Sequence, residues 1–326
     1  MNRWPVRLFL IAVALLSWPI NSPAPLIYRE GEGWVYEKVG GDTKWMRTRA
    51  KDQLQVAQEA FDKKEYNLAM RAARRTVAQW PLSDYAPQAQ YLEGRCEEAR
   101  GHDQVAFKSY QKLIEKYPKI ENYQEIVDRQ FAIANRFMGG QWFRLWSYIP
   151  IPPSMDKTAE MYETVIKNGP YSEVATKAQL NVGAVREKQA DFPLAIKAYE
   201  RAADRYADRE KVASEAMFKA GVAYTKQAKT AEYDQNVASQ AIATFTDFAT
   251  LHPDDARVPE AQKKIEVLRA EQARGSFEIA KFYEKGGKMN GALIYYNEVI
   301  VKDANSKYAA EARQRIDEIK KRMEKK

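Results

Sequence analysis

The sequence predicts an all-α protein in which helical hairpins repeat along the chain. Hydrophobic residues make up 45% of its 326 residues, but only 15 are glycine, fewer than a turn-rich β protein needs. Apolar residues recur at helical spacing, and the alternating pattern of strands is nearly absent. Small residues also recur in pairs twelve positions apart, namely Gly94 with Ala106, Gly183 with Ala195, and Ala280 with Ala292. Such pairs allow two helix backbones to approach closely.

The segment from Arg274 to Val301 shows the hairpin most clearly. Ala280 belongs to a helical pattern that Gly286 ends, and a second helical pattern with Tyr296 follows. Helices joined by so short a turn lie antiparallel. The order of small and aromatic residues resembles the tetratricopeptide repeat (TPR), which implies a right-handed superhelix with a concave face.

The first 24 residues predict an export signal. Arg3 and Arg7 precede an apolar run of eleven residues, Leu8 to Trp18, which is short for a membrane-spanning helix. An uncleaved anchor is the alternative. No cysteine follows the run, so the sequence does not predict a lipid-modified cysteine there. Residues 25–41 read as an extended lead-in, in which Trp34 and Tyr36 either pack on the first helix, the favoured interpretation, or bind a partner.

Six hairpins and a terminal helix follow the lead-in. Residues 42–170 hold the first three hairpins, with an aromatic insert at 139–156 inside the third. Residues 171–326 hold the other three and a last helix that begins near Lys307. Six alanines mark the second helices of the hairpins: Ala69, Ala106, Ala159, Ala195, Ala241 and Ala292. Six hairpins exceed the three or so that a stable stack needs.

The sequence predicts neither an enzyme nor a cofactor or metal site. Its single cysteine, Cys96, falls within a helical pattern and reads as a buried structural thiol. His102 and His252 stand alone, and no candidate nucleophile can be paired with a base. The net charge of +8 is mild and interleaved with acids. We therefore expect no nucleic-acid partner and no small-molecule substrate.

Two surfaces are candidates for binding proteins. The first lies on the leading helices of the first two hairpins, where aromatic residues beside charges suit an extended peptide; its residues are Leu54, Gln58, Phe61, Tyr91, Arg95 and Glu98. The apolar members fit a core between helices equally well. The second surface is the insert, which either folds over the array as a plug or forms an exposed patch for a partner or a membrane surface; its candidates are Trp142, Phe143, Trp146 and Tyr148.

The chain resembles the BamD (YfiO) family of outer-membrane assembly proteins. The resemblance is carried by ATFTDFATLHPDD and by the long helix ending in FEIAKFYEK, with the glycine turn after it, within residues 233–308. The opening KKEYNLAMRAARRTVAQWPLSDYAPQAQ also resembles the family, so that the likeness extends over roughly residues 43–320. It implies a periplasmic, non-catalytic scaffold associated with the outer membrane.

The resemblance also implies partners. Members of this family bind the BamA component of the barrel-assembly machine and unfolded outer-membrane protein segments. Tyr296 stands where the family often has an arginine that helps to dock the BamA-like partner, so that interface is an open question. The alternative function is that of a periplasmic TPR adaptor in a cell-wall or division complex, similar to the YbgF family of the Tol system.

Overall fold

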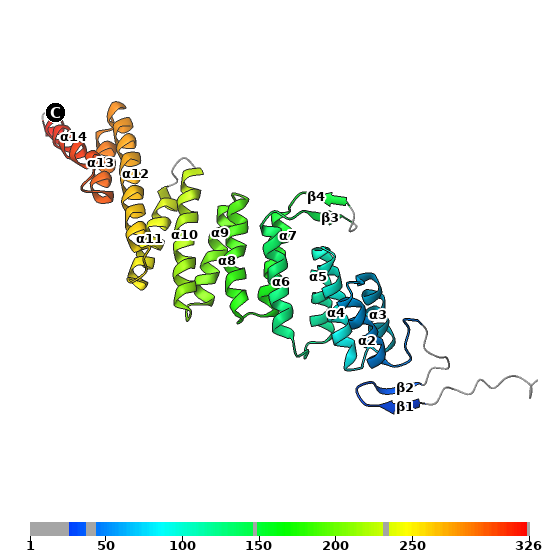
Figure 1. Ribbon diagram of the computed structural model, residues 1–326. Helices are drawn as coiled ribbons and strands as arrows, with labels where there is room; N and C mark the ends of the chain where they lie inside the picture. Colours follow the sequence, from blue (N-terminus) through cyan, green and yellow to red (C-terminus); the bar gives the residue numbers. More distant parts are fainter. Residues whose placement is uncertain (1–25, 37–43, 146–148, 231–234, 325–326) are drawn as a thin grey trace, which may run out of the picture. The chain divides into compact units, whose positions relative to one another are not determined.

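The computed structural model describes residues 26–36, 44–145, 149–230 and 235–324, which form thirteen helices and two short strand hairpins (Figure 1). The chain divides into two compact units, Met1–Ile120 and Glu121–Lys326. The third predicted hairpin, placed with the first two in the sequence division, lies in the second unit. The predicted export signal, Trp146 and Tyr148 fall outside the described residues. Within the described ranges, no helix combines the length and apolarity that crossing a membrane requires.

The first unit contains one strand hairpin and two helical hairpins. Each helix packs against the next along the chain, and α2 also contacts α4. Its elements are β1 (Leu26–Arg29), β2 (Gly33–Tyr36), α2 (Ala50–Asp62), α3 (Tyr66–Gln79), α4 (Tyr85–Ala99) and α5 (Asp103–Lys116).

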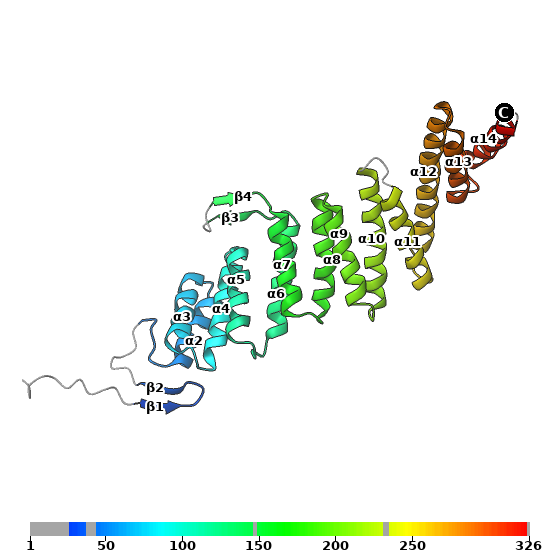
Figure 2. The ribbon, with the colours of Figure 1, turned by 180° about the vertical axis from the view of Figure 1, so that it is seen from behind.

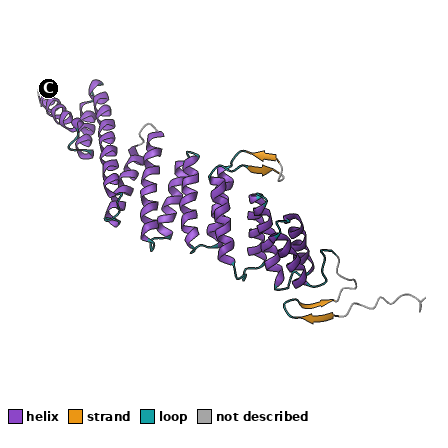
Figure 3. Cartoon of the chain, in the orientation of Figure 1, coloured by secondary structure: helices purple, strands orange, loops and turns teal. Residues whose placement is uncertain are grey.

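The second unit also consists of helical hairpins, four of them followed by a last helix. Figures 2 and 3 show the helices of this unit following one another in chain order. The first helix of one hairpin also contacts the first helix of the next at α6–α8, α8–α10 and α12–α14. The elements are α6 (Tyr123–Met138), β3 (Phe143–Leu145), β4 (Ile149–Ile151), α7 (Met155–Asn168), α8 (Glu173–Lys188), α9 (Phe192–Arg205), α10 (Glu210–Thr230), α11 (Gln235–Leu251), α12 (Val258–Lys285), α13 (Met289–Lys302) and α14 (Lys307–Glu324).

Close helix contact depends on small residues that face rings. A Cβ atom on Gly94 would come within 2.4 Å of the Tyr110 ring, and one on Gly183 within 2.3 Å of the Tyr199 ring. The glycine therefore makes room for an aromatic side chain on the partner helix. That aromatic residue lies one helical turn after the alanine that the sequence paired with the glycine. All six alanines predicted to mark the second helices are fully buried.

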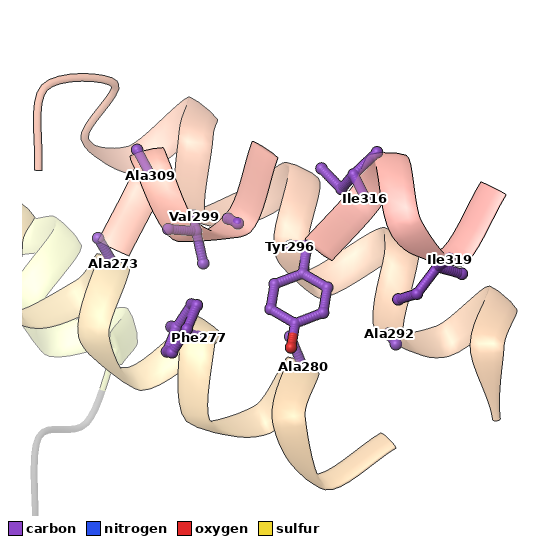
Figure 4. Packing of buried hydrophobic residues seen from close by; sticks show 10 residues of the cluster. Ala273, Phe277, Ala280, Ala292, Tyr296, Val299, Ala309, Ile316 and Ile319 are labelled. Atoms are coloured by element: carbon purple, nitrogen blue, oxygen red, sulfur yellow. The ribbon is translucent and has the colours of Figure 1, made fainter. Parts of the chain in front are cut away.

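The hairpin of α12 and α13 has the predicted core. Phe277 and Ala280 of α12 lie against Tyr296 of α13, while Ile316 of α14 covers the other side (Figure 4). The rings of Phe277 and Tyr296 meet edge to face, with centroids 5.6 Å apart. Helix α14 thereby covers this hairpin with an apolar face inward and a polar face outward.

The extended lead-in forms a strand hairpin whose aromatic residues do not pack on the first helix. Strands β1 and β2 pair antiparallel, with Tyr28 opposite Trp34. Trp34 and Tyr36 are both exposed, so the favoured packing interpretation was wrong. Glu32, in the turn, makes the contact with α2 instead: its carboxylate accepts a hydrogen bond from the Ala50 amide at 2.8 Å.

Candidate protein-binding surfaces

The first unit brings together three of the residues predicted to bind a peptide. The Arg95 guanidinium lies over the rings of Phe61 and Tyr91, 5.5 Å and 5.8 Å from their centroids. Arg95 Nη1 also donates a hydrogen bond to Tyr91 Oη at 3.2 Å. Phe61 comes from α2, whereas Tyr91 and Arg95 lie one turn apart on α4. We call these three residues the Arg95 cluster.

The other three predicted residues each have an environment of their own. Glu98 accepts a hydrogen bond at 2.8 Å from Tyr110, whose ring lies 6.0 Å from that of Tyr91. Leu54 is half-buried against the apolar core of the first two hairpins. Gln58 is exposed and donates to Asp62 at 3.0 Å.

The Arg95 cluster combines an accessible charge with aromatic surface. Its three side chains are half-buried, so each contributes both to helix packing and to the surface. A guanidinium held over two rings is preorganised, and it still has donors for a carboxylate or a backbone carbonyl. Such a site suits an extended peptide that presents a carboxylate or a backbone carbonyl next to an apolar side chain.

The insert of the third hairpin is partly a plug. Phe143 is buried and stacks on Phe137 with ring centroids 4.2 Å apart, and Lys157 Nζ lies 5.4 Å from the centroid of the Phe143 ring. Phe143 therefore belongs to the core, and its prediction as a partner-contacting residue was wrong. Trp142 has the opposite environment, being 56% exposed. Strands β3 and β4 extend this segment beyond α6 and α7 (Figure 1).

A groove between α10 and α12 was missed by the sequence interpretation. It encloses about 380 Å³, with buried Leu268 as its floor and exposed Val267 on its wall. Charged side chains form its rim: Lys229, Glu260, Lys263, Lys264 and Glu271. Residues 260, 264, 267 and 271 share one face of α12, but only the neighbouring α10 turns that face into a groove.

Tyr296 lies at a second pocket, of about 680 Å³, between α12 and α14. Its ring is fully buried, and its hydroxyl donates to Glu284 at 2.8 Å. Burial and the Glu284 carboxylate raise the pKa of Tyr296 to about 12. Arg315 of α14 forms an ion pair with the same carboxylate. Tyr296 is thus a core residue with a polar edge, and Arg315 supplies a guanidinium at this pocket.

The comparisons with known proteins agree with the repeat. Residues 154–303 match the YfiO family, described as outer membrane lipoprotein, and residues 88–119 match a tetratricopeptide repeat. The predicted likeness to YfiO is thereby confirmed over α7 to α13, while residues 88–119 of the first unit match the repeat. No curated protein matches the chain.

Three solved structures illustrate the likeness in structure. A TPR protein from Bacteroides fragilis is 14% identical, with a TM-score of 0.40 over 84% of this chain and 98% of its own. MamA from Desulfovibrio magneticus is 14% identical, with a TM-score of 0.32 over 64% and 97%. YrrB, a TPR protein with an unusual peptide-binding site, is 13% identical, with a TM-score of 0.33 over 66% and 92%. Residues 154–303 are thus similar to the YfiO family of outer membrane lipoproteins and residues 88–119 to a tetratricopeptide repeat, within a chain of successive helical hairpins.

Proposed function

We propose that the chain is a non-catalytic periplasmic scaffold that assists the insertion of β-barrel proteins into the outer membrane. The match of residues 154–303 to the YfiO family carries this proposal. The arrangement of charged and aromatic surfaces supports it, because both units offer side chains suited to binding polypeptides. The scaffold acts through recognition and holds its partners in place without making or breaking bonds.

The first unit holds the client in this proposal. An unfolded barrel strand presents alternating apolar and polar side chains with unpaired backbone groups. The Arg95 cluster offers rings for the apolar side chains and guanidinium donors for backbone carbonyls. Contacts of this kind depend little on the amino-acid sequence of the client, which suits a scaffold that receives many different precursors.

The second unit docks the barrel-assembly component. The groove between α10 and α12 offers apolar surface at Val267 within a rim of lysines and glutamates. The pocket between α12 and α14 adds Phe282, which is exposed, beside Arg315 and Glu284. Apolar patches surrounded by charges of both signs are typical of protein interfaces with a defined orientation.

Site-specific photo-crosslinking in cells tests both halves of the proposal. We expect a crosslinker at Tyr91 to capture unfolded outer-membrane precursors, and one at Val267 to capture a BamA-like barrel. A crosslinker at Tyr171, an exposed residue of the same type as Tyr91 in a loop before α8, is the control. Capture of Tol-system or peptidoglycan-associated proteins would instead support the adaptor function. Equal capture at Tyr171 and Tyr91 would contradict the client site.

Charge reversal gives a second test of the client site. Arg95→Glu removes the guanidinium from both rings and places a carboxylate near Glu98. We expect precursor capture at Tyr91 to fall by roughly tenfold or more, in line with the loss of about 1.5–3 kcal/mol for a hydrogen bond to a charged group. Lys177→Glu, on an exposed face of α8, is the matched control. Unchanged capture would remove Arg95 from the site.

A further inference from the structure

The strand hairpin of the first unit presents four large side chains on one uncovered face. Leu26 and Tyr36 are cross-strand partners, as are Tyr28 and Trp34. Alternation along both strands places all four on the same side. They are 50%, 66%, 65% and 68% exposed, respectively. We call these four residues the aromatic face.

The hairpin is attached through its turn and leaves this face open. Glu32 accepts a hydrogen bond from the Ala50 amide, and the Gly31 carbonyl accepts one from the Asp84 amide, both at 2.8 Å. Gly31 also lies against the Tyr85 ring, where an added Cβ would come within 3.0 Å. These contacts fix the turn to the starts of α2 and α4. The aromatic face is therefore presented by a docked element.

A basic segment lies at the same end of the unit. Residues 44–51, with the sequence KWMRTRAK, contain four cations and no acid. The segment runs into α2, whose Ala50 amide binds the hairpin turn. Lys44, Arg49 and Lys51 are exposed. The apolar face and the run of positive charge thus belong to two segments that are joined at the hairpin turn.

The chemistry of this region favours a lipid surface over a protein. Trp and Tyr side chains combine an apolar ring with a polar edge and concentrate where hydrocarbon meets headgroups. Basic residues beside such rings pair with anionic headgroups, and stable attachment takes two such signals. In the alternative in which the first 24 residues stay attached as an anchor, the apolar run Leu8–Trp18 ends eight positions before Leu26 and the hairpin follows a segment that meets a membrane.

We propose that the aromatic face seats in the headgroup layer of an anionic bilayer, with the basic segment paired to lipid phosphates. The four side chains bury their rings and methyl groups at the boundary with the acyl chains. Lys44, Arg49 and Lys51 set the preference for anionic lipid. This contact would hold the amino-terminal hairpins at a membrane surface, whether or not the client proposal is correct.

A fluorescent probe at the aromatic face tests the seating in the full chain. Tyr36→Cys is labelled with an environment-sensitive dye. Burial raises the pKa of the native Cys96 thiol to about 12, so that thiol stays protonated and unreactive. We expect phosphatidylethanolamine and phosphatidylglycerol vesicles to shift the emission to the blue, and nitroxide lipids labelled near the headgroup to quench it. The same dye at Leu82→Cys, 94% exposed in the same unit, should show neither change.

Further variants separate the two parts of the proposal. Replacing Lys44, Arg49 and Lys51 with Gln should lower the equilibrium constant for binding to anionic vesicles by about fivefold for each cation removed. Trp34→Ala should reduce the blue shift, and helical circular dichroism checks that each variant folds. An unchanged emission with vesicles would overturn the proposal. A blue shift that grows with protein concentration in the absence of lipid would assign the face to a second copy of the chain and would overturn it as well.

Discussion

Glycine opposite an aromatic ring is the residue-scale device that lets these helices approach. Gly94, Gly183 and Gly221 each lie where an added Cβ would come within 2.4, 2.3 and 2.7 Å of a ring on the next helix. Buried cores do not absorb such an intrusion without moving side chains or backbone. The twelve-residue spacing predicted that the two helices approach closely. The structure shows the reason, because the aromatic ring on the next helix occupies the space that a Cβ atom at the glycine position would need.

Gly183→Ala is expected to lower the free energy of unfolding of the second unit by about 1–3 kcal/mol, because the new methyl collides with the buried Tyr199 ring. Denaturant unfolding followed by circular dichroism measures the loss. Gly275→Ala is the matched control, since its methyl meets only the end of the flexible Gln235 side chain. Adding Tyr199→Val to Gly183→Ala should recover part of the loss. Equal costs at positions 183 and 275 would contradict this account.

Asp255 makes stability depend on pH in the acid range. Hydrogen bonds from Arg257, at 2.6 and 2.8 Å, hold the pKa of this carboxyl well below its ordinary value. Arg257 also donates to Ser214 and lies over Phe218, so the pair links α10 to the start of α12. Because the unfolded carboxyl binds protons more readily, its contribution is complete above about pH 5 and declines below about pH 4.

Thermal unfolding of the wild type and of Asp255→Asn tests whether the stabilisation by Asp255 is lost as the pH falls. The melting temperatures should differ most near neutral pH and converge as the pH falls below about 4. Asp254→Asn, at the exposed neighbouring position, controls for the loss of one charge. A difference that widened on acidification would show that the folded carboxylate is not stabilised by Arg257.

At the scale of elements, the insert between α6 and α7 contains one buried and one exposed aromatic residue. Phe143→Ala should destabilise the second unit by about 3–5 kcal/mol, because Phe143 is buried and stacked on Phe137. Trp142→Ala should change stability by less than about 0.5 kcal/mol. Differential scanning calorimetry of the two variants compares them directly. A large loss from Trp142→Ala would mean that the exposed part of the insert also holds the fold together.

The helices could be predicted from the sequence because each has a local signal. Small and aromatic residues at helical spacing mark Ala280 and Tyr296, and paired glycines such as Gly286–Gly287 end helices. The strand hairpin had no such signal, since its strands have only four residues each. Its attachment depends on Glu32 meeting an amide eighteen positions away, a contact that no local pattern encodes.

The candidate surfaces were predictable only in part, for a related reason. The Arg95 cluster joins residues of α2 and α4, and the repeat assigns both to leading helices, so their proximity followed from the architecture. To predict the groove between α10 and α12, one must know how Lys229 and Val267 lie relative to each other, and these residues are nearly forty positions apart in the sequence. Phe143 was misassigned because composition does not show which aromatic residue of an insert turns inward.

At the scale of the whole molecule, each of the two units contains an apolar core of its own. The core around Ala73 and Leu92 draws only on the first unit, and the core around Phe277 and Tyr296 only on the second. Repeat arrays are stabilised by each repeat and its nearest neighbours, so a local defect spreads over a short distance. An array built in this way can open in one unit while the other stays folded.

Matched glycine substitutions test this independence. Gly94→Ala places a methyl 2.4 Å from the Tyr110 ring in the first unit, as Gly183→Ala does at 2.3 Å from Tyr199 in the second. Hydrogen exchange measured by mass spectrometry should show that Gly94→Ala lowers protection in α4 and α5 and leaves α8 to α13 unchanged. Gly183→Ala should give the reverse pattern. Loss of protection in both units from either variant would mean that the chain unfolds as one cooperative body, and separate opening of the two surfaces would then be excluded.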